Sequence, residues 1–255
     1  MKYIKRRKFI GSVTSLLGLA GTGFISIKNS FIKTGISEES VKTIMLKGKQ
    51  NSIVTHWDII TIGNLSRNRY WGESDDRALH NPICTCTVIS CKDFHMVIDP
   101  SLADEEAMKN ELKRRTGLTP DNIDVVFITH QHEDHTAGLK HFQKAKWIAG
   151  REVASGINKS GTFVKKIEVA GEKLFETIDV ISTPGHTPDH KSLRFDYKGL
   201  SIVIAGDSVA TRDFWDERRS YYNVVNNEEA KATMEKINKM ADIIVPGHDN
   251  NFFNL

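Results

Sequence analysis

The chain has 255 residues, of which 39% are hydrophobic and 26% are charged. These are the proportions of an ordinary globular protein, and they exclude wholesale disorder. Residues 1–28 hold six basic residues and no acidic one, so the net charge of +3 becomes −3 for residues 29–255. A mildly acidic body disfavours nucleic acid as the main partner, although a local basic groove would still be compatible with it.

The first 28 residues have the layout of an export signal. A basic stretch, Met1–Lys8, is followed by a moderately apolar run, Phe9–Ile27. The sequence Arg6-Arg7-Lys8-Phe9-Ile10-Gly11 resembles a twin-arginine signal. An apolar run of this length could also anchor the chain in a membrane. We therefore expect export to the periplasm or the exterior, with membrane contact through the leader if it is not cleaved.

Residues 29–39 are interpreted as a linker, and residues 40–255 as one folded domain. Strands are expected at 41–46, 57–62, 84–90, 94–99, 124–129, 146–149, 164–169, 177–182, 191–196, 200–205 and 242–245. Helices are expected from Ser101 to Thr116 with Asp104 as a capping-box partner, from about Thr136, and over 227–241. Strand-rich blocks separated by helices predict an α+β fold with two mixed sheets flanked by helices.

The segment 63–91 contains two other features, a long polar connection and three cysteines. The long polar connection 63–82 is interpreted as a flap beside the active site, or alternatively as a solvated hairpin tip. Cys84, Cys86 and Cys91 are odd in number, which excludes a closed disulfide framework. We interpret them as buried free thiols, with a redox pair or a metal ligand as the alternative.

The densest motif follows the strand expected at 124–129. His130, His132, Asp134 and His135 place three imidazoles and one carboxylate within six residues. Neutral imidazole is a good zinc ligand, and a carboxylate suits a harder or second metal ion. The alternative is a polar loop that happens to be rich in histidine, and the spacing favours a metal site.

Three more segments repeat one pattern of apolar strand, glycine, and ligand-type residue. They end in Gly185-His186, Gly206-Asp207 and Gly247-His248. Glycine permits the sharp turn and close backbone approach that a metal site needs. We expect the ends of these strands to converge at one sheet edge.

This ordered set of four motifs resembles the metallo-β-lactamase superfamily, from about residue 41 to the C-terminus. The resemblance implies a four-layer αβ/βα sandwich, with residues 40–255 as the catalytic domain. It implies a first metal ion on His130, His132 and His186, a second on Asp134, His135 and His248, and Asp207 bridging both. The resident ions are expected to be zinc, with iron or manganese as alternatives, because His132 stands where redox di-iron relatives carry glutamate.

The resemblance also implies the chemistry. Two close cations lower the pKa of a bridging water, and the hydroxide attacks a carbonyl of a small ester, lactone, thioester or amide. Asp134 is the expected catalytic residue, because it can orient the nucleophile and pass a proton to the leaving group. A bridging aspartate is typical of glyoxalase II, lactonase and nuclease relatives more than of β-lactamases themselves.

Further residues are secondary candidates. Asp99 is expected to orient the metal-binding loop or to cap a helix, and His190 to make structural hydrogen bonds. Asp189 stands where the similar GHTPGH run has glycine, which affects that turn. Arg218 or Arg219 could bind an anionic group of the substrate, or else belong to a cover helix, and Tyr221 and Tyr222 are weaker candidates for oxyanion contact. The remaining histidines are expected to be solvated or satisfied by neighbours: His56, His80, His95 and His141.

Three functions compete. Hydrolysis of a small carbonyl substrate leads, phosphodiester or RNA cleavage is second, and a non-catalytic metal-binding protein is third. Lactonase relatives carry tyrosine three residues after the bridging aspartate, where this chain has Ala210, which weakens that assignment. Only seven residues follow His248, so the C-terminal substrate domain of glyoxalase II is not expected. The sequence does not fix the substrate or the oligomeric state.

Overall fold

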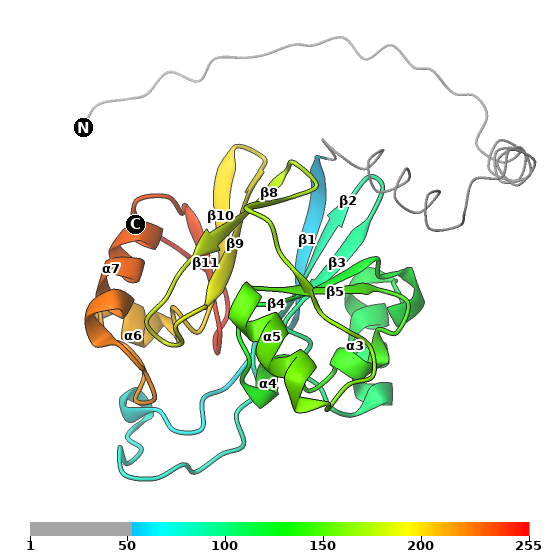
Figure 1. Cartoon of the computed structure of the whole chain (residues 1–255). Coiled ribbons are helices and arrows are strands. Elements are labelled where there is room, and N and C mark those ends of the chain that lie inside the picture. Colours follow the sequence, from blue (N-terminus) through cyan, green and yellow to red (C-terminus); the bar gives the residue numbers. More distant parts are fainter. Residues whose placement is uncertain (1–52, 255) are drawn as a thin grey trace, which may run out of the picture. The chain divides into compact units, whose positions relative to one another are not determined.

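The computed structural model describes residues 53–254. The predicted leader 1–28, the linker 29–39 and the strand 41–46 lie outside this range. The described elements form two six-stranded sheets, which Figure 1 shows with helices on their outer sides. No described helix is both long and apolar enough to cross a membrane.

The first sheet runs in the order β1 to β6. Its strands are β1 (Val54–Thr61), β2 (Cys86–Cys91), β3 (His95–Ile98), β4 (Val125–Ile128), β5 (Lys146–Ala149) and β6 (Glu168–Val169). The first three strands pair antiparallel, whereas β3 to β6 pair parallel.

The second sheet has the order β12-β11-β10-β9-β8-β7. Its strands are β7 (Lys173–Leu174), β8 (Ile178–Ser182), β9 (Lys191–Tyr197), β10 (Leu200–Gly206), β11 (Ile243–Pro246) and β12 (Phe252–Phe253). Among these described strands, only β10 and β11 pair parallel. A hairpin joins β9 and β10, which were predicted as strands at 191–196 and 200–205, through Lys198 and Gly199, both at the positive φ angles that a type I′ turn requires.

Alternating side chains build the four layers. In β4, Val125 and Phe127 pack between the sheets, while Val126 and Ile128 face the helices α3 (Glu105–Thr116) and α5 (Arg151–Ser160). In β10, Ile204 faces the other sheet, and its neighbours face α6 (Arg212–Asp216) and α7 (Asn227–Asn238). Successive strand residues point to opposite faces, so strands buried on both faces are apolar throughout.

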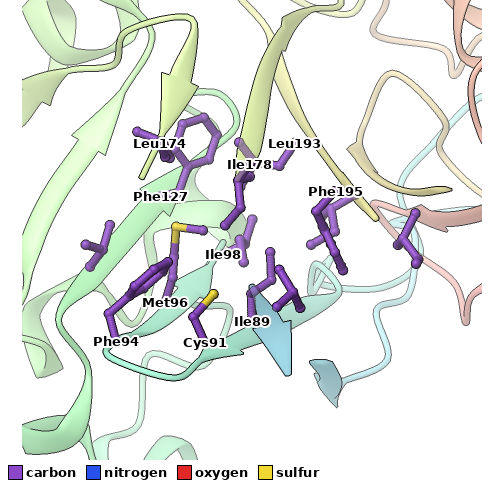
Figure 2. Close-up of a cluster of buried hydrophobic side chains, with 14 of the residues drawn as sticks. Ile89, Cys91, Phe94, Met96, Ile98, Phe127, Leu174, Ile178, Leu193 and Phe195 are labelled. Atoms are coloured by element: carbon purple, nitrogen blue, oxygen red, sulfur yellow. The ribbon is translucent and has the colours of Figure 1, made fainter. Parts of the chain in front are cut away.

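Figure 2 shows the layer between the sheets. Met96, Ile98 and Phe127 come from the first sheet, and they pack with Ile178 and Phe195 of the second. All of these side chains are almost fully buried. The two mixed sheets with flanking helices confirm the predicted fold class, and the shared core fixes the strand ends relative to one another.

Two predicted helix boundaries were wrong. α3 begins at Glu105 instead of Ser101, because Asp104 is itself the N-cap and its side chain accepts from the backbone N–H of Ala107. The hydroxyl of Ser101 contacts that of Thr61 instead. A helix does not start near Thr136: the short α4 (Glu133–Thr136) ends there, and the chain turns away.

Several short elements were not predicted at all, namely α5, β7 and β12. α5 was missed because Gly156 lies inside it and its N-cap is Gly150, which makes no side-chain capping bond. Glycine is a poor helix former, so the local pattern is weak. Three 3-10 helices also occur within the described range, at Arg69–Trp71, Pro120–Asn122 and Leu139–His141.

Candidate metal centre

Four strands deliver the predicted ligands. The motif of His130 follows β4, His186 follows β8, Asp207 follows β10 directly, and His248 follows β11. The structure brings all seven sequence-predicted residues into two groups whose potential ligand atoms lie within 4.8 Å of one another. The first group is His130, His132, His186 and Asp207, and the second is Asp134, His135 and His248.

In the first group, three imidazole nitrogens converge. Nδ1 of His132 lies 2.9 Å from Nε2 of His130 and 3.0 Å from Nε2 of His186. The Oδ2 atom of Asp207 lies 3.3 Å from Nε2 of His186. Ligands on one tetrahedral zinc ion are about 3.4 Å apart, given Zn–N bonds of about 2.1 Å. The spacing therefore fits a shared cation.

The second group has a similar spacing. Nε2 of His248 lies 3.5 Å from Oδ2 of Asp134, and Nε2 of His135 lies 3.8 Å from the same oxygen. Asp207 approaches this group too, with Oδ1 3.0 Å from Nε2 of His135 and 3.2 Å from Nε2 of His248. Asp207 therefore contacts both groups, with Oδ1 toward His135 and Oδ2 toward His186, while Nε2 of His248 also lies 3.3 Å from Oδ2.

Two buried atoms support the fit to a cation. Nε2 of His135 and Oδ1 of Asp207 are close, yet neither makes a hydrogen bond within the described part of the protein. Buried polar atoms without partners are costly and need an explanation. A metal ion between them satisfies both, and imidazole with carboxylate is a donor set suited to zinc and related divalent ions.

Hydrogen bonds on the far side of the His130 and His135 rings set the tautomers of these two residues. Thr129 donates its hydroxyl to Oδ2 of Asp99 at 2.7 Å, so Nδ1 of His130 must donate to that hydroxyl, at 3.0 Å. Nδ1 of His135 donates to Oδ2 of Asp99 at 2.8 Å. In the neutral form of each ring the lone pair is therefore on Nε2 and points inward, and this is the form that binds a metal.

His248 is held in the same way from a different direction. Its Nδ1 atom faces the backbone carbonyl oxygens of Asn64 and Ile83, at 3.0 Å each. Carbonyl oxygens only accept, so Nδ1 carries the proton and Nε2 is free toward Asp207. The two ends of the connection predicted as a flap thus help to orient one candidate ligand.

The electrostatics differ between the groups. Burial lowers the pKa of His186 to about 4 and that of His130 well below its usual value, so both rings are neutral at pH 7. Burial raises the pKa of Asp207, but His248 and its other imidazole neighbours outweigh this and hold the pKa well below the usual range. An ionised carboxylate among neutral imidazoles is ready to bind a cation.

The second group holds protons more strongly. Burial lowers the pKa of His135 and His248, but their acidic neighbours outweigh it. Those neighbours are Cys84, Asp207 and Asp99 at His135, and Asp207 at His248, and both pKa values are raised. A cation that binds there must displace these protons.

Three further residues named from the sequence, Asp99, His190 and Asp189, have different contacts in the structure. Asp99 contacts the metal-binding loop through Thr129 and His135 and caps no described helix. His190 lies outside both groups, and its Nδ1 bonds the hydroxyl of Thr183 at 2.8 Å. Asp189 accepts from the backbone N–H of Glu152 at 2.7 Å, so the residue in place of glycine ties the His186 turn to the start of α5.

Arg218 and Tyr221 make their contacts with residues outside the two groups. The guanidinium of Arg218 stacks over Trp215 and donates to Asn238. The hydroxyl of Tyr221 lies 2.8 Å from that of Ser66 and 3.2 Å from the carbonyl of Arg67, so its hydrogen bonds go to the flap. Partners are also found for the remaining histidines: His56 with Asp58, His80 with Glu73, His95 with Ser90, and His141 with Ala103.

The connection between β1 and β2 packs onto the segment after Asp207. Leu65 is buried against Ala210 and Phe214, and Tyr70 donates to Glu217 at 2.7 Å. Tyr222 donates to Asp75. The predicted flap is therefore a packed connection, although Trp71 and Leu79 on it are exposed.

Sequence reasoning missed two residues that act behind the ligands. Thr129 links Asp99 to His130, and its position directly before the first histidine was the only signal. Cys84 donates its thiol to the carbonyl oxygen of Asp134 at 3.2 Å. All three cysteines are free and buried, which confirms the interpretation made from their number.

Residues 82–248 match the sequence profile of the Metallo-beta-lactamase superfamily. The chain belongs to this superfamily. The matched range contains all seven residues of the two groups.

The chain is similar to individual members of the superfamily over part of their length. The chain is 30% identical over 140 residues to metallo-beta-lactamase domain-containing protein 1 of Xenopus laevis, covering 52% of this chain and 56% of the relative. It is 24% identical over 163 residues to an N-acyl homoserine lactonase of a Bacillus species, covering 59% of this chain and 65% of the relative. The match thus spans less than two thirds of either curated relative.

Solved structures agree on the superfamily fold. A structure of an N-acyl homoserine lactone hydrolase, with the product N-hexanoyl-L-homoserine bound at its catalytic metal centre, superimposes with a TM-score of 0.61. The sequence identity is 18%, and the match covers 78% of this chain and 94% of that one. At this identity the likeness establishes the fold.

Proposed function

We propose that this superfamily member is a metal-dependent hydrolase that holds two divalent ions, zinc in the first instance, and cleaves a small ester, lactone, thioester or amide at its carbonyl. The observation that carries the proposal is the position of Asp207, whose carboxylate oxygens contact imidazole nitrogens of both groups. A carboxylate placed in this way is suited to bridge two cations.

The residues of the two groups would have different roles in this reaction. His130, His132 and His186 would hold one ion, Asp134, His135 and His248 the other, and Asp207 both. When bound, such a pair lowers the pKa of water to near 7 and polarises the carbonyl. Asp134 is only half-buried, so its carboxylate can accept a proton from the attacking water and return it to the leaving group.

Two observations bear on the substrate class. The similar lactonases and lactone hydrolase act on carbonyl substrates by their names, which favours carbonyl over phosphorus chemistry. Ala210 is buried against Leu65 and Phe214, so the position three residues after Asp207 offers no hydroxyl. We therefore place esters and thioesters before lactones in the panel to be tested.

The experiment is turnover by the zinc-loaded full chain on p-nitrophenyl esters, thioesters, lactones, β-lactams and bis-p-nitrophenyl phosphate. The proposal predicts turnover of a carbonyl substrate and its loss in Asp207→Ala, with at least one metal group still able to form. Turnover of the phosphodiester alone would replace the proposal with a nuclease-type activity. Bound metal without any turnover would favour a binding protein.

We also propose, from the sequence of residues 1–28, that the chain is exported. Replacement of Arg6 and Arg7 by lysine in the full chain would block a twin-arginine route, and the protein would then accumulate in the cytoplasmic fraction. An unchanged distribution between cell fractions contradicts that route.

A further inference from the structure

A cavity of about 540 Å³ lies beside the first metal group. Its lining includes Gln131 and Glu133, the two chain neighbours of His132, and Pro188, which is two residues beyond His186. The cavity is therefore lined by the loops that carry these two candidate ligands, although the ligand side chains themselves are not part of the lining. Its volume is in the range of sites for small molecules.

The floor of this cavity is apolar. Ile157 of α5 and Phe163, which follows that helix, line it together with Pro188 and Gly156. Phe163 is held by an edge-to-face contact with the buried ring of Trp147, at 5.4 Å between centroids. The wall is thus supported from behind and can receive an apolar group.

The charged side chains that line the cavity are all acidic. It holds three carboxylates and, among the described residues, no lysine or arginine. Asp189 is matched by Lys191, whose Nζ lies 2.8 Å from its Oδ1 atom, so its charge is offset. Glu133 and Glu152 remain, both exposed at the cavity. An anionic group placed between them would be repelled.

We propose that this cavity is the acyl subsite: it takes an apolar, uncharged acyl chain and disfavours one that ends in a carboxylate. This inference rests on the proposed hydrolysis and deepens it, because it names the part of the substrate that sets specificity. The ester bond then lies at the metal groups: the oxygen of water bonds to the acyl carbon, the acyl carbon–oxygen bond to the alcohol breaks, one proton of the water goes to the leaving alcohol, and the other is released when the acid product ionises.

Gly156 offers a clean test. A Cβ atom built there meets no atom within 4 Å, so a larger side chain enters open space without displacing the helix. Gly156→Phe should fill the cavity, Gly156→Leu should fill part of it, and Gly156→Ala is the matched control. Wild type should prefer p-nitrophenyl hexanoate over the acetate in kcat/KM by at least about tenfold, because added methylenes gain binding in an apolar pocket.

The expected result is that Gly156→Phe removes the preference for hexanoate over acetate in kcat/KM, while Gly156→Ala keeps this preference. The same preference for chain length in Gly156→Phe and Gly156→Leu as in wild type would overturn the proposal. A second comparison uses mono-p-nitrophenyl adipate, which has the same acyl length and a terminal carboxylate. Glu152→Gln with Glu133→Gln should raise adipate turnover selectively, and equal turnover of both esters by wild type argues against the charge selection.

Binding separates this proposal from the proposed activity. Hexanohydroxamic and acetohydroxamic acids are titrated calorimetrically into the zinc-loaded full chain. Tighter binding of the hexanoyl compound in wild type, lost in Gly156→Phe, supports the subsite even if no ester is turned over. Equal binding of the two compounds to wild type refutes the subsite while leaving the hydrolase proposal to its own assay.

Discussion

Thr129 gives both of its donors to Asp99, the backbone N–H to Oδ1 at 2.8 Å and the hydroxyl to Oδ2 at 2.7 Å. Oδ2 also accepts from His135, and the hydroxyl accepts from His130. One carboxylate therefore sets the tautomer of a ligand in each metal group. Asp99 reaches this position through a left-handed backbone conformation, with φ at +50°.

Asp99→Asn should weaken metal binding without unfolding the protein. Asparagine tolerates the positive φ angle, but its amide would direct a donor at Nδ1 of His135 and favour the wrong tautomer. Loss of such a partner costs about 10–100-fold in metal affinity. Zinc titration against a competing chelator measures it, with Asp104→Asn as a control that keeps a helix cap away from the site. Equal affinities in wild type and Asp99→Asn would show that Asp99 has no such role.

Thr129→Val should affect the first metal group. Valine has nearly the shape of threonine but removes the hydroxyl that accepts from His130. We expect weaker binding of the first ion by about tenfold or more, as for other losses of a partner behind a ligand. Thr129→Ser keeps the hydroxyl and should retain most of the affinity. If valine and serine behave alike, packing and not the hydrogen bond explains the position.

Gly247→Ala should disturb Asp207 directly. A Cβ atom at Gly247 would lie 2.0 Å from Oδ1 of Asp207, closer than atoms can approach, so the carboxylate must move. We expect loss of at least one ion per chain in elemental analysis. Gly156→Ala is the control, because it meets no atom and should stabilise its helix by about 0.5–1 kcal/mol. Full metal content in Gly247→Ala would contradict the assignment of Asp207.

The three thiols should be unreactive in the folded protein. Burial raises the pKa of Cys84 and of Cys91 to about 12 and that of Cys86 well above its usual value. A raised pKa leaves the thiols neutral at pH 8, and the thiolate is the reactive form. Titration with a thiol-specific disulfide reagent should label none of them at pH 8 and all three in denaturant. Rapid labelling of the native protein would refute the burial of at least one cysteine.

The sequence predicted the features of the site that follow from local patterns of residues. Each candidate ligand follows an apolar strand, and that pattern placed His186, Asp207 and His248 correctly at strand ends although tens of residues separate them. The strands predicted at 191–196 and 200–205 were equally readable, because Gly199 between them suits the positive φ angle of a tight turn.

The sequence did not predict the roles of residues that depend on contacts between distant segments of the chain. Thr129 gains its role only when β3 and β4 pair and bring Asp99 beside it. The backbone carbonyls of Asn64 and Ile83, which orient His248 in the second group, belong to no side-chain pattern. Their role arises only where the connection between β1 and β2 meets the end of β11.

The most direct test of a dinuclear centre bridged by Asp207 is the number of metal ions that the full chain binds. The protein is loaded with excess zinc, dialysed against metal-free buffer, and measured by elemental analysis beside Asp207→Ala. Two groups that share one carboxylate predict about two zinc ions per chain in wild type and fewer in the variant. One ion or none in wild type, or an unchanged content in Asp207→Ala, would contradict a dinuclear centre bridged by Asp207.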